Sequence, residues 1–384
     1  MVLTRLTVEN FTVFGPGRTT FDLSSGVNVL VGENGTGKTH LLKLVYVVSR
    51  VSQELGRRQV AEAESPPSHA GSVQVNRRRI PGTNLWTVDP NAPSVEPMRD
   101  DEMERWVATE LKDVFQPDSL AHFANILGEP CAVVAEWEGS ETIRIVIYEL
   151  GAVSVQLEGL HHTAKPPLFL PSRELLTLYP GFAAAWLRRE SAFDRTYLDL
   201  CLALGLRPLR AEVRAGAIED LAATLEGTLK GPVTMDRDRF YLAYPRGPME
   251  VTMVGEGDRK IAMLAYLLRN GSLAPGGLLA WDEPEASLNP KRANLMSKVA
   301  FDLARAGIQV VLSTHDYALC SELDLAAKRG SEEKLAFFGL KEGDRHVEVE
   351  RSPSFLGLKG NPILEAFADI YDREEAWHRS EGAP

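Results

Sequence analysis

A glycine-rich segment that ends in lysine and threonine is the clearest sign of chemistry in the sequence. Residues 32–39 read Gly-Glu-Asn-Gly-Thr-Gly-Lys-Thr, which fits the pattern G-x-x-x-x-G-K-[ST] of a phosphate-binding P-loop. Glycines let backbone N–H groups turn toward phosphate oxygens, and a helix that starts there directs its positive dipole end at the same anion. We therefore predict a nucleotide site in this loop. Its expected contacts are Asn34, Gly35, Thr36, Gly37, Lys38 and Thr39.

Two side chains of the P-loop have separate expected roles. The Lys38 ammonium would reach the β- and γ-phosphates of ATP, and the Thr39 hydroxyl would ligate Mg²⁺. The flanking segments suit the motif, because residues 27–31 read as a buried strand and residues 40–48 as a helix. The alternative is an ordinary glycine-rich turn with an exposed lysine, and the strand–loop–helix setting favours the nucleotide site.

Two further apolar runs end in polar side chains. Residues 278–281 precede Asp282 and Glu283, a Walker B pattern in which Asp282 would hold Mg²⁺ and Glu283 would polarise the attacking water as general base. Residues 308–312 precede His315, at the strand end where open α/β sheets bind ligands. A single histidine can instead be structural, but its place after an acidic strand end favours contact with the γ-phosphate. The expected catalytic residues are Lys38, Glu283 and His315.

The elements that must position these side chains alternate between strand and helix patterns. We expect antiparallel strands over 2–31, a long loop over 62–100, a β-meander over 131–159 and a mainly helical region over 172–229. Further helices are expected at 100–115, 117–127, 258–270 and 361–378, and a short β segment at 238–254. The predicted units are an ATPase lobe (1–60), a loop-rich and helical insertion (61–130), a β-meander returning to the core (131–160), a helical arm (161–250), a second ATPase lobe (251–345) and a C-terminal extension (346–384).

Composition limits the classes of protein to consider. Of the 384 residues 44% are hydrophobic and 25% charged, as in soluble globular proteins, and no apolar run is long enough to span a bilayer, so we expect a cytoplasmic protein. The net charge of −11 weighs against nucleic-acid binding over the whole surface. The basic clusters at 57–58 and 77–79 are interpreted as solvated loop charges, with phosphate contacts as the alternative. Three cysteines far apart suggest neither disulfides nor a zinc site.

Together these segments resemble the ABC-type ATPase heads, a P-loop class that includes the SMC, RecF and OLD-like proteins. Residues 282–290, Asp-Glu-Pro-Glu-Ala-Ser-Leu-Asn-Pro, are most similar to the D-loop of the OLD-like branch, with Leu288 in place. Residues 8–11, Val-Glu-Asn-Phe, resemble the N-termini of the same proteins, and residues 171–174 resemble compact bacterial ATPases of this branch. The resemblance implies an α/β P-loop NTPase fold: an ABC-ATPase-like head with an N-terminal antiparallel β layer and a helical insertion.

The sequence departs from this class in two places. The signature L-S-G-G-Q is absent, and Gly255-Glu256-Gly257 stands before the expected helix. The resemblance assigns Gly257 and Arg259 to the γ-phosphate held by a partner subunit, with Arg259 or Lys260 compensating the charge of Glu256; the alternative is a tight turn before a core helix. No glutamine stands out for the Q-loop, where Glu174 is a weak candidate and otherwise part of a helix start.

The resemblance implies a homodimer, or a higher homo-oligomer, that closes head-to-head around ATP and Mg²⁺, hydrolyses ATP and drives a separate effector protein. For the OLD-like branch the effector would be a nuclease or toxin, in bacterial antiviral defence. Alternatives are a RecF-like DNA-repair clamp, which the acidic net charge disfavours, and a non-hydrolysing ATP-gated scaffold, which the altered signature motivates. Adenine could stack on Phe11 or Phe14, although both fit core positions better. No membrane partner is expected.

Overall fold

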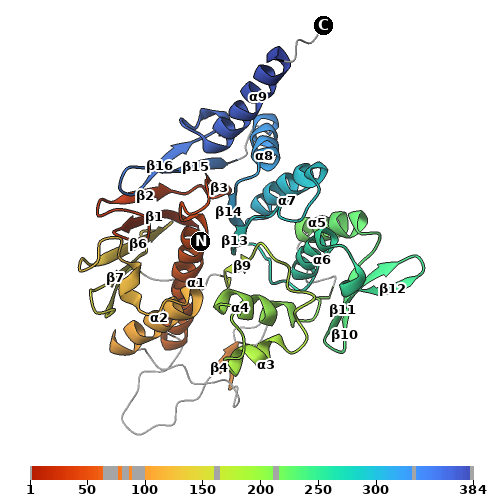
Figure 1. Ribbon diagram of the computed structural model, residues 1–384. Helices are drawn as coiled ribbons and strands as arrows, with labels where there is room; N and C mark the ends of the chain where they lie inside the picture. Colours follow the sequence, from red (N-terminus) through yellow and green to blue (C-terminus); the bar gives the residue numbers. More distant parts are fainter. Residues whose placement is uncertain are drawn as a thin grey trace.

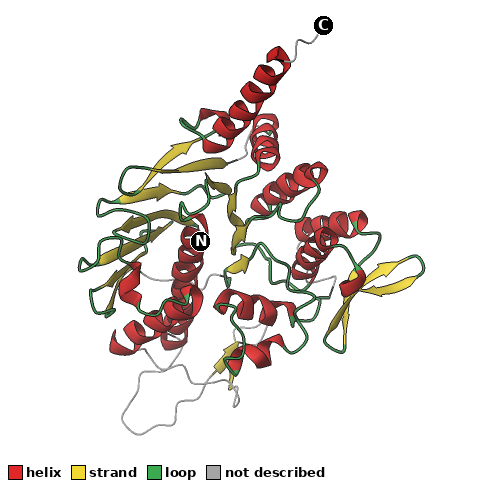
Figure 2. Cartoon of the chain, viewed as in Figure 1, coloured by secondary structure: helices red, strands yellow, loops and turns green. Residues whose placement is uncertain are grey.

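The computed structural model describes residues 2–63, 77–79, 86–88, 100–159, 165–210, 216–330 and 334–380 (Figures 1 and 2). Most of the loop expected at 62–100 lies outside these residues. Inside that range β4 (Arg77–Arg79) and β5 (Trp86–Val88) pair as antiparallel strands, so the basic run at 77–79 forms a strand where a loop was expected.

A six-stranded sheet forms the centre of the fold, in the order β16-β15-β3-β14-β13-β9. All neighbouring strands are parallel except β16, which pairs antiparallel with β15. The strands are β3 (Val27–Gly32), β9 (Leu168–Leu170), β13 (Leu278–Asp282), β14 (Gln309–Thr314), β15 (Leu335–Glu342) and β16 (Val347–Ser352). Every residue of β3 and β14 is buried, which explains why the middle of each strand is apolar, at residues 29–31 and 310–312.

Successive residues of the central strands enter two separate hydrophobic cores, because side chains alternate between the faces of a sheet. Val29 faces one core, shared with helices α4 to α8, whereas Leu30 faces the other, shared with α1. Helix α1 (Lys38–Ala63) starts within the P-loop. The helices of the first core are α4 (Arg195–Leu204), α5 (Gly216–Thr228), α6 (Glu256–Arg269), α7 (Ala293–Arg305) and α8 (Tyr317–Arg329).

A second, antiparallel sheet covers the α1 side in the order β2-β1-β6-β7-β8. Its strands are β1 (Leu3–Glu9), β2 (Thr19–Asp22), β6 (Cys131–Trp137), β7 (Thr142–Ile147) and β8 (Val153–Glu158). The expected N-terminal strands and β-meander are both present, and they form one sheet because β1 pairs with β6. Buried Gln309 ties the two sheets together, since its amide exchanges hydrogen bonds of 3.0 and 2.8 Å with the backbone of Leu3.

The remaining elements are α2 (Asp100–Phe115), α3 (Phe182–Leu187), the three-stranded sheet β10 (Val233–Asp236), β11 (Arg239–Tyr244) and β12 (Gly247–Glu250), and α9 (Pro362–Ser380). Short 3₁₀ turns lie at Leu120–Phe123, Val251–Met253, Pro290–Arg292 and Phe355–Gly357. Figure 1 shows α9 extending from the body toward the C-terminal end.

Three sequence predictions differ from these elements. The helix expected at 117–127 is only the turn Leu120–Phe123, because Gln116 has a φ of 53° and Ser119 caps a new turn. By contrast, the mainly helical region expected at 172–229, with breaks at Pro180-Gly181 and Pro208, agrees with the described residues: α3 begins directly after the first break and α4 ends before the second. The range assigned to a helical arm also contains β9, which is an edge strand of the central sheet, and the assigned C-terminal extension contains β16.

Candidate functional site

The P-loop joins β3 to α1 and has the backbone conformation that its glycines permit. Gly35 and Gly37 both have a φ of 87°, in the left-handed region that favours glycine. A Cβ atom at Gly37 would lie 2.6 Å from Cγ2 of Val13, so the backbone passes too close to that side chain for any other residue. Buried Thr36 closes the loop, since its hydroxyl donates a 2.8 Å hydrogen bond to the Glu33 carbonyl. Asn34 and Gly35 remain exposed at the tip.

Lys38 is buried beneath the loop. Its Nζ donates to the carbonyl oxygens of Gly32, at 2.8 Å, and Glu33, at 2.7 Å. Burial lowers the pKa of the Lys38 ammonium, while the nearby carboxylates of Glu283 and Asp282 act in the opposite direction. The ammonium is thus held at the mouth of the loop by neutral acceptors, and a phosphate oxygen placed there would be a stronger, charged partner.

Thr39 and Asp282 lie side by side, although 243 positions separate them in the chain. The Thr39 hydroxyl is 3.2 Å from Oδ1 and 3.1 Å from Oδ2 of Asp282, and the Ser313 hydroxyl also donates to Oδ1. Burial raises the pKa of Asp282, and the hydrogen bonds from Ser313 and Thr39 partly oppose that rise. A hydroxyl and a carboxylate that converge in this way fit Mg²⁺, which prefers oxygen ligands.

The metal would need more oxygens than these two side chains supply. In the described part of the chain, no group of three or more His, Cys, Asp or Glu side chains could hold a metal ion. Mg²⁺ commonly binds through one or two carboxylates and completes its shell with substrate phosphates and water. The pair therefore suits an ion that arrives with a phosphorylated substrate.

Glu283 and His315 form a second pair, since they follow the neighbouring strands β13 and β14. Nδ1 of His315 lies 3.1 Å from Oε1 of Glu283, and the Glu283 N–H donates a 3.0 Å hydrogen bond to the Ser313 carbonyl. Glu283 has a φ of 46°, a strained conformation for a residue other than glycine, and such strain concentrates at functional sites. The structure thus brings the expected general base and the expected histidine into contact, next to Asp282.

Glu285 accepts a hydrogen bond next to this site, a role that was not predicted from the sequence. Its Oε1 accepts a 2.6 Å hydrogen bond from the Thr314 hydroxyl, next to His315, while its Oε2 is buried without a hydrogen-bond partner. Burial raises the pKa of Glu285 to about 7. On the other side, Nζ of buried Lys260 donates a 3.4 Å hydrogen bond to the Glu283 carbonyl, and burial lowers the pKa of that lysine.

The signature turn, Gly255-Glu256-Gly257, begins helix α6 as expected, with Gly255 as its N-cap. A Cβ atom at Gly257 would lie 3.0 Å from Cδ2 of Leu288 and 3.1 Å from the Ser287 carbonyl, so the turn packs closely on the D-loop of the same chain (residues 284–290). The three atoms nearest to that Cβ position all belong to Ser287 and Leu288. The expected role of Gly257 at the phosphate of a partner subunit stays a prediction.

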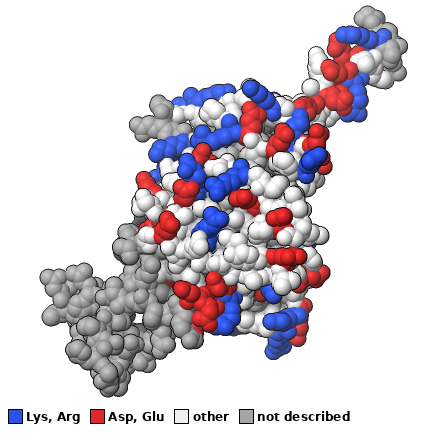
Figure 3. Space-filling view, turned by 90° about the vertical axis from the view of Figure 1, so that its left-hand side faces the viewer, with Lys and Arg blue, Asp and Glu red and all other residues white. Residues whose placement is uncertain are grey.

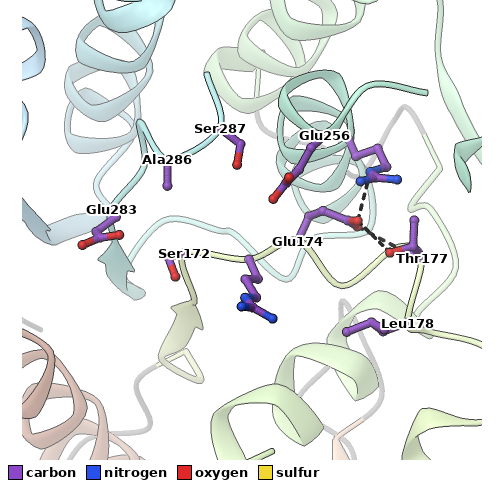
Figure 4. Close-up of a pocket in the computed structure, with 10 residues that line it drawn as sticks. Ser172, Glu174, Thr177, Leu178, Glu256, Glu283, Ala286 and Ser287 are labelled. Atoms are coloured by element: carbon purple, nitrogen blue, oxygen red, sulfur yellow. Dashed lines mark hydrogen bonds and ion pairs between the residues drawn. The ribbon is translucent and has the colours of Figure 1, made fainter. Parts of the chain in front are cut away.

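Arg259, the other residue expected to reach that phosphate, is held within its own chain. Its Nε lies 3.0 Å from Oε1 of Glu174, and only 19% of its side chain is exposed. The contact is an ion pair without hydrogen-bond geometry, so the buried Nε has no hydrogen-bond partner. The same glutamate accepts hydrogen bonds from the backbone and hydroxyl of Thr177, so it caps a turn and anchors an arginine. Figure 4 shows these contacts at the rim of a pocket.

That pocket, which we term the Glu283 pocket, has a volume of about 500 Å³ and is lined both by Glu283 and by Glu256 of the signature turn. Its lining includes Ser172, Arg173, Glu256, Arg259, Glu283 and Ser287. The carboxylates of Glu256 and Glu283 approach it from different elements (Figure 4).

The aromatic residues near the P-loop belong to the core. Phe11 and Phe14 are both fully buried. The ring of Phe11 stacks on Phe123 with centroids 5.4 Å apart, and the ring of Phe14 meets Phe21 edge-on at 5.8 Å. Neither can stack on a base without leaving the core, so the core interpretation of both residues is confirmed.

Charged side chains of both signs lie on the face of the described residues that Figure 3 draws. Arg57, from one of the basic clusters, is paired with Glu54 at 2.9 Å. No helix among the described residues is long and apolar enough to cross a membrane.

Two sequence stretches match known family models. Residues 245–321 match the model described as "AAA domain, putative AbiEii toxin, Type IV TA system", and residues 5–58 match an "AAA domain" model. The first stretch contains the signature turn, Walker B, D-loop and His315, and the second contains the P-loop. No curated protein matches the chain.

Solved structures of SMC heads resemble the whole fold. An SMC head bound to the C-winged helix domain of ScpA is 11% identical with a TM-score of 0.53, covering 92% of this chain and 98% of that one. The SMC head domain of Thermotoga maritima is 13% identical with a TM-score of 0.46, covering 92% and 99%. A head with an extended coiled coil, bound to a ScpA domain derived from Pyrococcus furiosus, is 10% identical with a TM-score of 0.48, covering 96% and 99%. At these identities the first match shows a shared fold.

Proposed function

We propose that the chain binds ATP with Mg²⁺ and hydrolyses it; the support is a P-loop NTPase fold similar to an SMC head and the two stretches that match AAA-domain models. One observation carries the proposal. Residues from three separate strand ends, Thr39 after β3, Asp282 and Glu283 after β13, and His315 after β14, meet at one edge of the parallel sheet. Ligands of open α/β sheets bind at that edge.

Each residue of this group has a role that its position supports. Lys38 would exchange its two carbonyl partners for the β- and γ-phosphates, and Thr39 and Asp282 would hold Mg²⁺ between them and the phosphates. The carboxylate of Glu283 would orient a water molecule and accept its proton. His315, 3.1 Å from that carboxylate, would hold it in place and respond to the γ-phosphate.

The second part of the proposal is a head-to-head homodimer. The signature turn presents the N-terminus of α6, a long helix whose first turn can stabilise an anion. In our proposal Gly257 and Arg259 of one chain approach the nucleotide on the P-loop of its partner. Arg259 would then have to share its guanidinium between Glu174 and the phosphate, because Glu174 already holds its Nε.

We further propose that ATP-driven closing and opening acts on a separate effector protein, in bacterial antiviral defence. The support is the D-loop sequence at 282–290, which is most similar to the OLD-like branch, and the matching family description, which names a toxin of a toxin–antitoxin system. Partner binding by a head of this fold has a precedent in the SMC head bound to ScpA. Affinity purification of the chain with ATP, compared with Lys38→Ala, would recover a nuclease or toxin only with the wild type.

The hydrolysis proposal is tested by comparing the steady-state ATPase rates of the wild type, Glu283→Gln and Glu149→Gln. Removing the general base should lower the rate by about 100-fold or more, whereas Glu149, exposed in a distant turn, should have no effect. Equal rates for Glu283→Gln and the wild type would show that Glu283 is not the base. A wild type that binds ATP without turnover would instead select the ATP-gated scaffold.

The dimer proposal is tested with the same variant by size-exclusion chromatography with light scattering. Glu283→Gln in saturating ATP and Mg²⁺ should elute at twice the mass of the chain, and in ADP at a single mass. Lys38→Ala/Glu283→Gln is the matched control and should remain monomeric in both nucleotides. A Glu283→Gln variant that stays monomeric in ATP would contradict head-to-head closure.

A further inference from the structure

Strand β9, the outermost strand of the central sheet, is followed by a short loop at the end of the sheet where the site residues lie. Strand β9 runs parallel to β13, and Leu170 lies beside Trp281 in the register. The chain therefore leaves the sheet at residues 171–173 next to the position where β13 ends in Asp282 and Glu283. Because β9 is parallel to all three strands that carry site residues, its carboxyl end faces the same ligand space.

Arg173 in this loop is an exposed cation without a fixed partner. Within the described residues its side chain makes no hydrogen bond or ion pair, although it lines the Glu283 pocket. Arg259, which lines the same pocket, is by contrast committed to Glu174. The other cations at the site, Lys38 and Lys260, are buried and donate to backbone carbonyls.

The phenol of Tyr197 lies within electrostatic reach of both Arg173 and Asp282. Its pKa is raised to about 12, mainly by burial and then by Asp194 and Asp282, while Arg173 lowers it. The pocket also receives the carboxylates of Glu256 and Glu283. A free guanidinium among these carboxylates is suited to an incoming phosphate, because its planar fork of N–H donors matches phosphate oxygens.

We propose that Arg173 is a catalytic residue that contacts the γ-phosphate of ATP bound to its own chain. This inference rests on the proposed ATPase function. During hydrolysis the water oxygen bonds to the γ-phosphorus as its bond to the β,γ-bridging oxygen breaks. The electron pair of that bond leaves with ADP, and the proton of the water passes to Glu283. Arg173 stabilises the negative charge on the equatorial oxygens, the role of an arginine supplied in cis in other phosphoryl-transfer sites.

The inference predicts that Arg173 distinguishes ATP from ADP, because only ATP has the γ-phosphate. We would measure equilibrium binding of both nucleotides by calorimetry, in the Glu283→Gln background to prevent turnover. Adding Arg173→Ala should weaken ATP binding by about tenfold or more, as expected for the loss of a charge-assisted hydrogen bond, and leave ADP binding within about twofold. Arg173→Lys, which keeps the charge without the fork, should fall between.

Arg246→Ala is the matched control, since Arg246 is exposed in the turn between β11 and β12, outside the central sheet that carries the site. It should bind both nucleotides like the parent. Equal losses for ATP and ADP, or no loss for ATP, would overturn the role of Arg173 while the parent still binds ATP. A parent that binds neither nucleotide would refute the proposed function and the inference with it. Circular dichroism of each variant identifies any loss of folding.

Discussion

The ionisation of Glu285 should be costly to the folded protein, and this can be measured. Its Oε1 has one hydrogen bond, from Thr314, and its buried Oε2 has none. The pKa of Glu285 is raised from 4.5 to about 7, mainly by burial; Asp316 also raises it, while hydrogen bonds from Thr314 and the backbone, and the charge of His315, lower it. The difference corresponds to about 3 kcal/mol of stability. Glu285→Gln removes the charge and keeps an acceptor for Thr314.

The sign of the pH dependence follows from proton binding. The folded chain holds the Glu285 proton more tightly than the unfolded chain, so this contribution to stability is fully present below about pH 4.5 and is lost as pH rises through about 7. The variant has no such loss. Its advantage over the wild type should therefore grow by about 2 kcal/mol between pH 5 and pH 8, or about 2–3 °C in the melting midpoint of a chain of this length.

The assay is thermal unfolding by circular dichroism at intervals from pH 5 to pH 8.5. Glu149→Gln, at an exposed turn, serves as the matched control and should follow the wild type at every pH. Other titrating groups act equally in both proteins, so the difference isolates Glu285. A difference that stays constant over this range, or a wild type that is the more stable at pH 8, would refute the reasoning.

Three further predictions concern the P-loop, the metal pair and the core. Gly37→Ala should lower ATP affinity at least about tenfold in calorimetry, because it adds a Cβ 2.6 Å from Val13 at a φ of 87°; unchanged affinity would show that the loop can shift freely. Thr39→Val should raise the Mg²⁺ concentration for half-maximal hydrolysis about tenfold or more, whereas an unchanged Mg²⁺ titration would remove Thr39 from the ligand set. Arg50→Leu should destabilise the fold by about 3–5 kcal/mol in urea unfolding, because it leaves the buried carboxylate of Glu110 without its 2.7 Å partner; a loss under 1 kcal/mol would contradict this.

The parts of the fold that could be predicted are those whose burial shows in the sequence as a run of apolar residues. Strands β3, β13 and β14 are covered on both faces, so each is an apolar run that ends where its polar side chains begin. Strand β9 has only three residues, too few to show any period. The helix expected at 117–127 failed for a local reason, the left-handed backbone at Gln116, which the helical pattern did not reveal.

In the site too, residues that belong to local sequence motifs could be predicted, whereas contacts that depend on tertiary packing could not. Fixed spacing within short motifs identified Lys38 and Thr39, and strand ends identified Glu283, because neighbouring residues determine these positions. The pairing of Arg259 with Glu174 joins residues 85 positions apart and depends on where α6 lies relative to the loop after β9, which no local pattern encodes. Glu285 was read only as part of the D-loop, since its burial comes from the assembled fold.

The place of β3 in the central sheet also determines when this protein can become functional during synthesis. Val29 of β3 pairs with Leu312 of β14, 283 residues later, on one side and with Phe337 of β15, 308 residues later, on the other. Until they leave the ribosome, β3 has two open edges and an apolar surface that needs protection. Contacts of such long sequence separation also slow folding. A newly made chain would therefore complete the surroundings of its phosphate-binding loop only after β14 and β15 have been translated, long after the residues of the loop itself.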